Sequence, residues 1–376
     1  MTGLWGRGRQ LATVCHRVVA FWLLGWLWSY GLPTAGGATS GVCHQDLSWL
    51  ARYPVRYAAA PLQTPQGTVN AWLYQPEGLT DAPALVMVHG VHKDGGQEAR
   101  LKNFAQALAA AGFTVLTPHV QSLADYRIEK SAIEVIGWSA QALQRRTGRR
   151  VGVMGLSFAG GLCLMAAADK RFAPAIGYIL AVGAHADLGR VTRFLLTGEI
   201  ATPNGETLKL QADPYGALLL AHTHAAVLFA PSDVEPARAA LRSWLWGEPD
   251  RARRQAAKLS PAGQRLAQAL FDGDYAAATP SLLRQLERRR SALREVSPQD
   301  ALARIRCPVF LVHGARDAVV PPSETQWLAQ GLGGRCRVLI SRAVGHVEVN
   351  DSATPLEKLE VAQFLNDFLA TARAIR

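Results

Sequence analysis

The stretch Val151-Gly-Val-Met-Gly-Leu-Ser157-Phe-Ala-Gly-Gly161 decides how the rest of the chain is interpreted. Its apolar first half predicts a short buried strand, and the mainly apolar residues 162–169 predict a helix directly after it. Gly155 and Ala159 flank Ser157 at a distance of two positions, and only small residues fit there when a serine is held at a sharp strand-to-helix turn. The pattern is typical of a nucleophile elbow, although Ala159 stands where G-x-S-x-G has its second glycine.

The serine also has a simpler interpretation. A serine at the start of a helix often accepts a hydrogen bond from a free N–H group of the first turn, so Ser157 could be an ordinary N-cap. The motif alone leaves both interpretations open, and the choice between them depends on the other residues that the fold brings to the serine.

The composition is that of a globular protein. The 376 residues could form one large domain or two smaller ones, and a hydrophobic content of 49% is ample for a sizeable core. The net charge is +11, but the arginines are interspersed with acidic residues, and no nucleic-acid-binding motif is present. We therefore expect a solvated surface and no nucleic-acid partner.

The N-terminal segment resembles an export signal. It carries arginines but no acidic residue, and these are followed by the apolar run 18–32 and by a stretch of small residues that ends at Ala38. The apolar run is short for a membrane span, although its tryptophans would also suit an uncleaved anchor at the membrane surface. Residues 1–38 are therefore predicted to be a signal peptide or an N-terminal membrane anchor. The rest of the protein is expected to be exported (periplasmic or secreted) or anchored to the membrane by this segment.

Downstream, strands alternate with helices. The continuous apolar run 84–90 is typical of a strand that is buried on both faces of a parallel sheet. Further strands are predicted at 113–116, 150–154, 176–182, 308–314 and 337–340, with helices at 97–111, 129–146, 323–332 and 355–372. Because every parallel connection needs a crossover, this alternation predicts an α/β fold with a mostly parallel, doubly wound sheet. A hairpin of residues 53–60 and 68–74 is expected to precede it.

Residues 184–306 interrupt the alternation. They hold no strand of comparable strength, and they are far longer than an ordinary connection. We interpret them as a helical cap inserted between two parts of the core, residues 45–183 and 307–376. Trp244 and Trp246 in this cap could line a substrate entrance, but we expect at least one of them to be a packing residue.

The cysteines suggest one covalent link. Cys163 lies on the apolar helix after the serine and is expected to be buried. Cys307 and Cys336 each lie at the start of a predicted strand, and an oxidising compartment could join them if those strands are neighbours. No cysteine–histidine spacing resembles a zinc site, and we predict no metal and no cofactor.

Two further polar residues follow the ends of predicted strands. Asp317 comes just after one in His313-Gly-Ala-Arg-Asp317, and His346 comes just after the next in Gly345-His346. Because the carboxyl ends of parallel strands meet at one edge of the sheet, both should lie near Ser157.

Other acids and histidines compete for these positions. Asp187 also lies just beyond a strand end and is the main alternative to Asp317. His89 and His313 are expected to be structural, whereas His92 and His185 could line the pocket.

Taken together, these motifs resemble the α/β-hydrolase superfamily. They are His89-Gly90, the elbow around Ser157, the segment from His313 to Asp317 with Val320-Pro321, and Gly345-His346. The resemblance covers the chain from about residue 53 onward and fits the cap only loosely. It implies that Ser157 attacks an acyl carbonyl, that His346 takes and returns the proton, and that Asp317 orients the imidazole.

The same resemblance implies an oxyanion hole. Its donors would be the backbone N–H of Phe158 and an N–H from the loop after His89-Gly90, which we assign to Val91.

A serine at the elbow argues against the dehalogenase and epoxide-hydrolase branches of the superfamily, which use an aspartate there. The motifs look most like the dienelactone-hydrolase and peptidase-like branches, which implies acyl transfer to water. The first expectation is therefore hydrolysis of a small carboxylic ester, as in carboxylesterases, and the second is a serine peptidase or amidase. The non-enzymatic alternative is a catalytically inactive binding module with the same fold.

Overall fold

The computed structural model describes residues 52–346 and 354–375. The predicted signal or anchor, residues 1–38, lies outside the described residues. Within the described ranges, no helix combines the length and the apolar character needed to cross a membrane.

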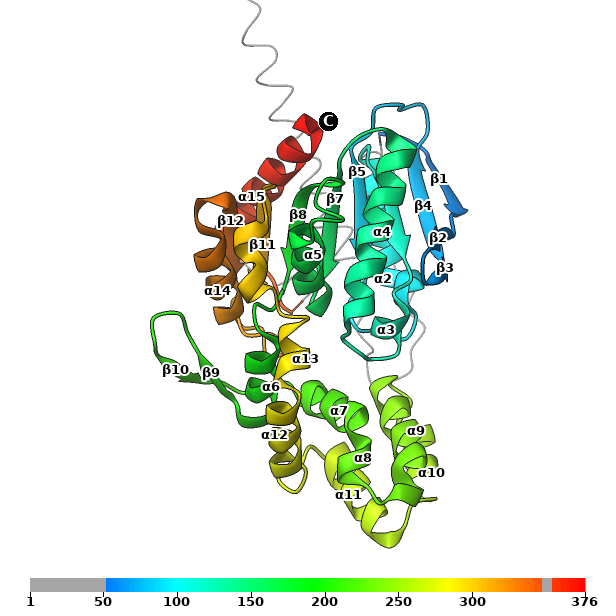
Figure 1. The fold of residues 1–376 in the computed structure, drawn as a ribbon, viewed down its shortest axis with the longest axis vertical. Helices are drawn as coiled ribbons and strands as arrows, with labels where there is room; N and C mark the ends of the chain where they lie inside the picture. Colours follow the sequence, from blue (N-terminus) through cyan, green and yellow to red (C-terminus); the bar gives the residue numbers. More distant parts are fainter. Residues whose placement is uncertain (1–51, 347–353, 376) are drawn as a thin grey trace, which may run out of the picture.

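An eight-stranded sheet forms the centre of the molecule, with the strand order β1-β4-β6-β5-β7-β8-β11-β12 (Figure 1). The pairs from β6 to β12 are parallel, whereas β4 pairs antiparallel with both β1 and β6. The strands are β1 (Val55–Ala59), β4 (Ala71–Pro76), β5 (Ala84–Val88), β6 (Thr114–Pro118), β7 (Val151–Leu156), β8 (Ile176–Val182), β11 (Val309–Gly314) and β12 (Cys336–Ser341). The predicted α/β fold with a mostly parallel sheet is confirmed.

Helices cover both faces of the sheet, so its central strands are apolar without alternation. Every residue of β5, β8 and β11 is buried. One hydrophobic cluster contains residues of α4 (Lys130–Thr147), α5 (Phe158–Ala168) and α14 (Ser323–Leu332). A second cluster, on the opposite face, contains residues of α2 (Ala99–Ala110) and α15 (Pro355–Ala374).

Short elements complete the core. The ribbon of β2 and β3 extends from the connection between β1 and β4, so the predicted N-terminal hairpin is interrupted by a second, smaller one. The short elements are β2 (Leu62–Thr64), β3 (Gly67–Val69), α3 (Gln121–Ala124) and the 3₁₀ turns η2 (Gly95–Gln97), η4 (Pro298–Arg304) and η5 (Gly333–Arg335).

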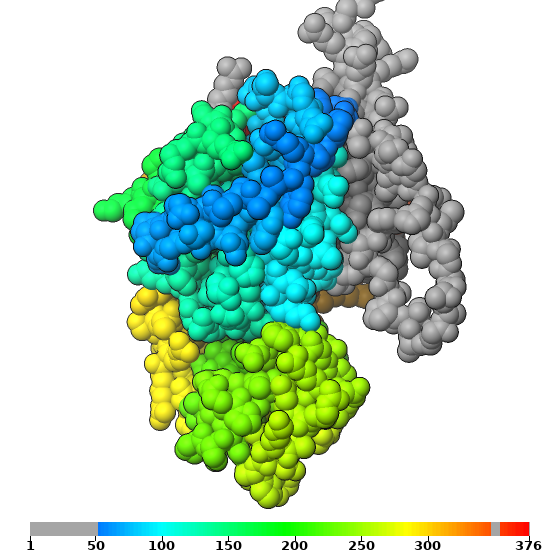
Figure 2. All heavy atoms as spheres, turned by 90° about the vertical axis from the view of Figure 1, so that its right-hand side faces the viewer, coloured from blue at the N-terminus to red at the C-terminus, as the bar shows by residue number. Residues whose placement is uncertain are grey.

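A mainly helical insertion connects β8 to β11. In the space-filling view it forms a lobe at one end of the molecule, below the N-terminal strands (Figure 2). Trp244 stacks on Phe271 inside it, with ring centroids 4.2 Å apart, and so it is a packing residue. The helices are α6 (Leu188–Thr197), α7 (Pro214–Thr223), α8 (Ala225–Leu228), α9 (Val234–Leu245), α10 (Pro249–Ala256), α11 (Pro261–Phe271), α12 (Thr279–Arg288) and α13 (Arg290–Arg294), with the 3₁₀ turn η3 (Pro231–Asp233).

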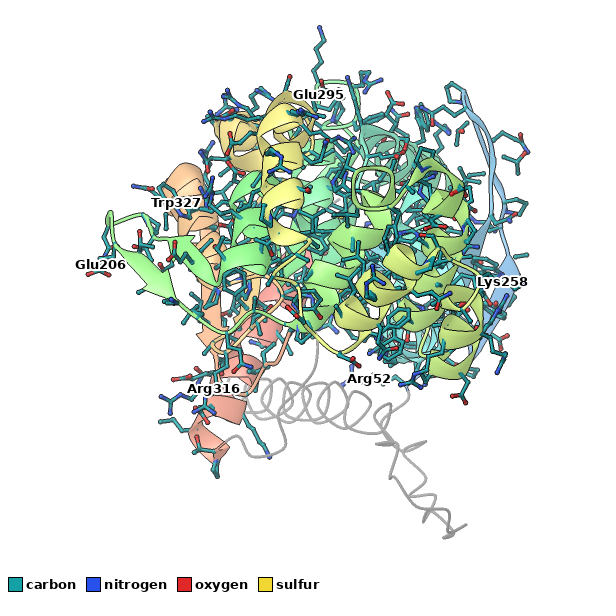
Figure 3. All side chains as sticks on the ribbon, turned by 90° about the horizontal axis from the view of Figure 1, so that it is seen from below. Arg52, Glu206, Lys258, Glu295, Arg316 and Trp327 are labelled. Carbon is teal, nitrogen blue, oxygen red and sulfur yellow. The ribbon has the colours of Figure 1, made fainter. Side chains whose placement is uncertain are left out.

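The insertion also contains a β-hairpin that its sequence pattern does not predict. Strands β9 (Glu199–Ala201) and β10 (Thr207–Lys209) pair antiparallel, and Figure 3 shows Glu206 near the tip of the projecting arm. Trp327 of α14 anchors the base, because its indole N–H donates a hydrogen bond to the carbonyl of Ala201 at 3.1 Å. Strands of three residues are too short to give a periodic hydrophobic signal.

The predicted disulfide between Cys307 and Cys336 is wrong. Both cysteines are free, although β11 and β12 are indeed neighbours. The register pairs Val309 with Cys336, so Cys307 lies two residues upstream of the position opposite Cys336. The spacings of a sheet then separate the two Cα atoms by about 8 Å, beyond the reach of a disulfide. Cys163 is buried, as expected.

Candidate active site

The structure places Ser157 at the turn between β7 and α5. Its backbone has a φ of 56° and a ψ of −133°, a conformation that residues with a side chain rarely adopt. A hydrogen bond from its N–H to the carbonyl of Val182 at the end of β8, 2.7 Å long, holds the turn in place. The Ser157 side chain makes no N-cap hydrogen bond to the helix. Its hydroxyl is therefore available for another partner.

Small residues allow this turn to form. A Cβ atom on Gly155 would lie 2.4 Å from the carbonyl oxygen of Ala159, which no side chain can tolerate. A Cβ atom on Gly160 would similarly lie 2.7 Å from the Cβ of Ala184. Helix α5 therefore packs directly on the strands and begins at Phe158, earlier than its apolar run predicts.

Three sequence-predicted side chains meet at the carboxyl edge of the sheet. The Ser157 Oγ atom lies 2.7 Å from Nε2 of His346. The Nδ1 atom of the same imidazole lies 2.6 Å from Oδ2 of Asp317. With the proton on Nδ1, His346 donates to the carboxylate and accepts from the serine hydroxyl, which is the arrangement that a general base requires.

Asp317 lies in an environment that keeps its carboxylate charged. Its Oδ1 atom accepts hydrogen bonds from the backbone N–H groups of Val319 and Val320, at 2.8 and 2.9 Å. Burial would raise the pKa of Asp317, but the charge on His346 and hydrogen bonds from both His313 and His346 outweigh it and hold the pKa well below its usual range.

Asp187, the alternative acid, has a different task. Its side chain caps α6 and accepts a hydrogen bond from the backbone N–H of Arg190 at 3.0 Å.

The two predicted oxyanion-hole residues border the same space. Phe158 is the first residue of α5, so its N–H belongs to the set that has no partner within the helix. Val91 lines the cavity that also exposes Ser157 and His346. The hydroxyl of Tyr215, from α7 of the insertion, donates a hydrogen bond to the carbonyl of Val91 at 3.4 Å.

His89 fixes the start of the loop that carries Val91. Its Nδ1 atom lies 2.7 Å from the carbonyl of Gly90, and its Nε2 atom accepts a hydrogen bond from Val120 N–H at 2.9 Å. Burial lowers the pKa of His89 to about 3, so the ring is neutral at physiological pH. His89 is therefore structural.

Of the other predicted histidines, two are buried and one lines the cavity at the serine. His313 is buried between the side chain of Thr325 and the carbonyl of Val320. His185 is buried against the carbonyl of Val296 and does not line the triad cavity, whereas His92 does.

The cavity at the serine has a volume of about 260 Å³. Its walls include Tyr126, Tyr215 and Leu245, none of which belongs to a recognisable motif. Tyr126 has a φ of 62°, a conformation with no local sequence signature such as a glycine. In the described part of the chain, no cluster of three or more histidine, cysteine, aspartate or glutamate side chains is arranged to hold a metal ion.

Comparison with protein families identifies the chain. Residues 68–346 match the sequence model of the X-Pro dipeptidyl-peptidase (S15) family. The chain belongs to this family. The matched S15 segment ends at His346 and so contains Ser157, Asp317 and His346 together. No curated protein sequence matches the chain.

Solved structures that are similar to this chain include a peptidase, a hydrolase and Est1E. The acylaminoacyl peptidase of Pyrococcus horikoshii has a TM-score of 0.50 at 13% identity, over 84% of this chain and 41% of the peptidase. A puromycin hydrolase has a TM-score of 0.51 at 13% identity, over 90% of this chain and 42% of the hydrolase. Est1E from Butyrivibrio proteoclasticus has a TM-score of 0.48 at 14% identity, over 84% of this chain and 99% of Est1E.

This S15-family chain therefore has the α/β-hydrolase fold, and it spans about two fifths of the length of the two hydrolases with the higher scores.

Proposed function

We propose that the protein is a serine hydrolase that transfers the acyl group of a small amide or peptide to water. The observation that carries the proposal is the continuous chain of hydrogen bonds from Ser157 Oγ through His346 to Asp317, with distances of 2.7 and 2.6 Å. A serine is a weak nucleophile until a neighbouring base removes its proton, and this arrangement supplies the base and the group that orients it.

In the proposed reaction, Ser157 Oγ attacks the carbonyl carbon while its proton moves to Nε2 of His346. The negative charge on the carbonyl oxygen is stabilised by the N–H groups of Phe158 and Val91. The C–N bond then breaks, and the amine leaves with the proton from His346. Water attacks the acyl-enzyme in the same way, which releases the acid and regenerates the serine. Asp317 stays ionised throughout and stabilises the imidazolium cation.

Membership of the S15 family supports an amide or peptide substrate over the ester that the motifs first suggest. Ester turnover alone would not distinguish the two, because esters carry a better leaving group than amides. The informative quantity is the rate for an amide and an ester of the same acyl group, measured with one enzyme preparation.

A fluorophosphonate probe tests the nucleophile. Wild-type protein and a Ser281→Ala control should be labelled, whereas folded Ser157→Ala and His346→Ala variants should not. Labelling of Ser157→Ala at the wild-type level would show that the nucleophile is another residue. Folded wild-type protein that resists labelling and hydrolyses no amide or ester would support the binding-module alternative instead.

Matched p-nitroanilide and p-nitrophenyl ester substrates test the bond that is cleaved. We expect measurable amide hydrolysis by the wild type, and a loss of roughly 10⁴-fold or more in kcat for Ser157→Ala. Hydrolysis of the esters alone, across a panel of acyl groups, would favour the carboxylesterase.

We also propose that the protein acts outside the cytoplasm. The basic, apolar and small-residue succession in residues 1–38 supports this. N-terminal sequencing of the protein from an exporting host should give Thr39 as the first residue if the segment is cleaved. Recovery of the uncleaved chain in the cytoplasm would contradict export.

A further inference from the structure

A second cavity lies next to the one at the serine. It has a volume of about 210 Å³, and helices α6, α7, α12 and α13 of the insertion form most of its walls. We call it the cap cavity. Its lining is mainly aliphatic and includes Leu188, Leu195, Leu219, Leu282, Leu286 and Val296. Enclosed apolar spaces with a few polar groups are typical of small-molecule binding sites.

Two aromatic side chains separate the cap cavity from the triad cavity. Tyr126 and Phe158 line both spaces. Phe158 directly follows the candidate nucleophile, and the Tyr126 hydroxyl accepts a hydrogen bond from the backbone of Lys93, in the loop that carries Val91. The two cavities thus adjoin across a wall that is connected to both parts of the proposed oxyanion hole.

The backbone is strained at Tyr126 and at Ser157, the residue before Phe158. Among the described residues, Tyr126 and Ser157 are the non-glycine residues with positive φ, at 62° and 56°. Such conformations cost energy and concentrate at functional sites. One of the two presents the nucleophile, and the other places an aromatic ring at the junction of the cavities.

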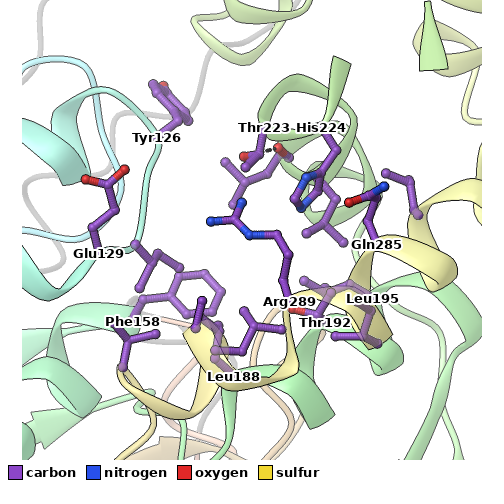
Figure 4. Close-up of a pocket in the computed structure, with 18 of the residues that line it drawn as sticks. Tyr126, Glu129, Phe158, Leu188, Thr192, Leu195, Thr223, His224, Gln285 and Arg289 are labelled. Atoms are coloured by element: carbon purple, nitrogen blue, oxygen red, sulfur yellow. Dashed lines mark hydrogen bonds between the residues drawn. The ribbon is translucent and has the colours of Figure 1, made fainter. Parts of the chain in front are cut away.

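Arg289 gives the cap cavity a cationic group. Figure 4 shows its guanidinium reaching across the cavity towards the side of Tyr126 and Glu129. Within the described part of the chain, this guanidinium has no hydrogen bond or ion pair. Arg289 remains accessible to solvent, so a ligand can reach it.

The other charged and titratable groups of the cap cavity are Glu129, Lys130, His224 and Glu295. Glu129 already lies 3.5 Å from Arg127 in an ion pair. Burial, with a smaller contribution from the charge on Arg289, lowers the pKa of His224 to about 4, so that ring is neutral at physiological pH. Lys130 and Glu295 are exposed residues at the border of the cavity. Among the described residues, the guanidinium of Arg289 has no anion bound to it, and it lies in a cavity whose lining is mainly aliphatic.

We propose that the cap cavity binds an apolar arm of the substrate that ends in a carboxylate, and that Arg289 binds this carboxylate. Aliphatic walls favour the arm, and a guanidinium pairs with a carboxylate through charge-assisted hydrogen bonds. The inference rests on the proposed function, because it extends the same site. The carboxylate could come from the acyl part, as in a dicarboxylic acid, or from the free C-terminus of a peptide leaving group.

Two pairs of substrates separate these sources. The first pair is the p-nitroanilide of suberic acid, which carries a free terminal carboxylate, and octanoyl p-nitroanilide, a neutral counterpart of the same length. The second pair is N-acetyl-Ala-Leu with a free C-terminus and its C-terminal amide, with cleavage of the Ala–Leu bond followed by mass spectrometry. In one of the pairs, the wild type should prefer the carboxylate form.

Arg289→Met tests the role of the guanidinium, with Arg288→Met as the matched control, because Arg288 is the exposed last residue of α12 and directly precedes Arg289. Arg288 does not line the cap cavity. We expect Arg289→Met to lower the ratio of kcat/KM for the carboxylate substrate to kcat/KM for its neutral partner by roughly tenfold or more. Arg288→Met should leave the ratio at its wild-type value.

A bulky substitution tests the cavity itself. Leu196 lines the cap cavity and is half-buried, so Leu196→Trp should reduce its volume. We expect the ratio of kcat/KM for suberoyl to kcat/KM for acetyl p-nitroanilide to fall if the acyl arm occupies the cavity. Circular dichroism checks that the variant is folded.

The experiments distinguish a failure of the cap-cavity proposal from a failure of the proposed function. A wild type that is labelled at Ser157 and hydrolyses neutral amides, but whose preference is unaffected by both Arg289→Met and Leu196→Trp, would overturn the cap-cavity proposal alone. A wild type that is neither labelled nor active on any substrate would overturn the proposed function instead.

Discussion

Asp317 shares one carboxylate oxygen between two histidines: Nε2 of His313 lies 3.2 Å from Oδ2, the atom that His346 contacts at 2.6 Å. His313 is fully buried, and its other ring nitrogen lies 2.6 Å from the hydroxyl of Thr325. The Nε2 atom of His313 also lies 2.7 Å from the carbonyl of Val320. His313 therefore contacts both Asp317 and the segment that follows it, and it does not line the cavity at the serine.

His313→Gln should weaken this support. Hydrogen bonds to charged groups contribute roughly 1.5 kcal/mol or more, so we expect kcat to fall about tenfold with a much smaller change in KM. Thr325→Val keeps His313 but removes its hydroxyl partner, and it should give a smaller effect. Steady-state kinetics on one amide substrate gives kcat and KM for both variants. If kcat of His313→Gln equals that of the wild type, His313 does not position Asp317.

Gly155→Ala should disrupt the elbow, because the new Cβ would lie 2.4 Å from the carbonyl oxygen of Ala159. That atom is backbone, so the strand and helix must separate. We expect a loss of at least about 2 kcal/mol in the free energy of unfolding, together with loss of fluorophosphonate labelling. Gly334→Ala is the control, since its Cβ would meet no atom within 4 Å. Equal urea midpoints for the two variants would contradict the steric argument.

Glu324 should be essential for stability, because it is a buried carboxylate with several partners. Its Oε2 atom accepts hydrogen bonds from the backbone N–H groups of Ala186 and Asp187, at 2.8 and 2.9 Å, and its Oε1 atom lies 2.5 Å from Nε of Arg190. Removing one partner of a buried ion pair typically lowers the free energy of unfolding by roughly 3 to 5 kcal/mol. We expect a loss of this size for Glu324→Ala.

The control for Glu324 is Glu287→Ala, which breaks an exposed ion pair with Arg193. Exposed pairs contribute less than about 1 kcal/mol. Urea unfolding of both variants tests the difference, and similar losses for the two would show that the buried pair makes no special contribution.

His89 should make the protein less stable in acid. Its pKa is about 3 in the folded state against an ordinary value of 6.5, so between these values the unfolded chain takes up a proton that the folded protein excludes. The stabilisation from the neutral ring is complete above pH 6.5 and is lost as the pH falls towards 3, by at most about 1.4 kcal/mol per pH unit.

The measurement is the free energy of unfolding from pH 7 to pH 4.5 for the wild type and for His89→Asn. The variant should be less stable at neutral pH, but its stability should depend less steeply on pH. An identical slope in the two proteins would mean that His89 does not exclude the proton in the folded state.

The sheet could be predicted from the sequence because its central strands are buried on both faces. Continuous apolar runs such as Ala84–Val88 carry that information locally. The order of the motifs also placed Ser157, Asp317 and His346 at one edge of the sheet, where the structure brings them within hydrogen-bond distance.

Features that depend on tertiary detail could not be predicted. The disulfide prediction failed because the adjacency of two strands does not fix their register. Cys336 lies opposite Val309, which is two residues beyond Cys307. The cap cavity is assembled from four helices of the insertion and from residues of the core, so the position of Arg289 in it has no local signature. The start of α5 was placed too late because Gly160 and Gly161 weaken the helical pattern, although both allow close packing against Ala184 and His185.

The insertion between β8 and β11 also determines when the proposed catalytic residues are synthesised. Ser157 and His346 are 189 residues apart, so at roughly 5 to 20 residues per second the histidine is added roughly 10 to 40 s after the serine. A nascent chain that has folded as far as β8 can already form the strained turn, but its hydroxyl has no base to activate it. The serine therefore has its activating base only after β11 and β12 have joined the sheet and His346 has followed them.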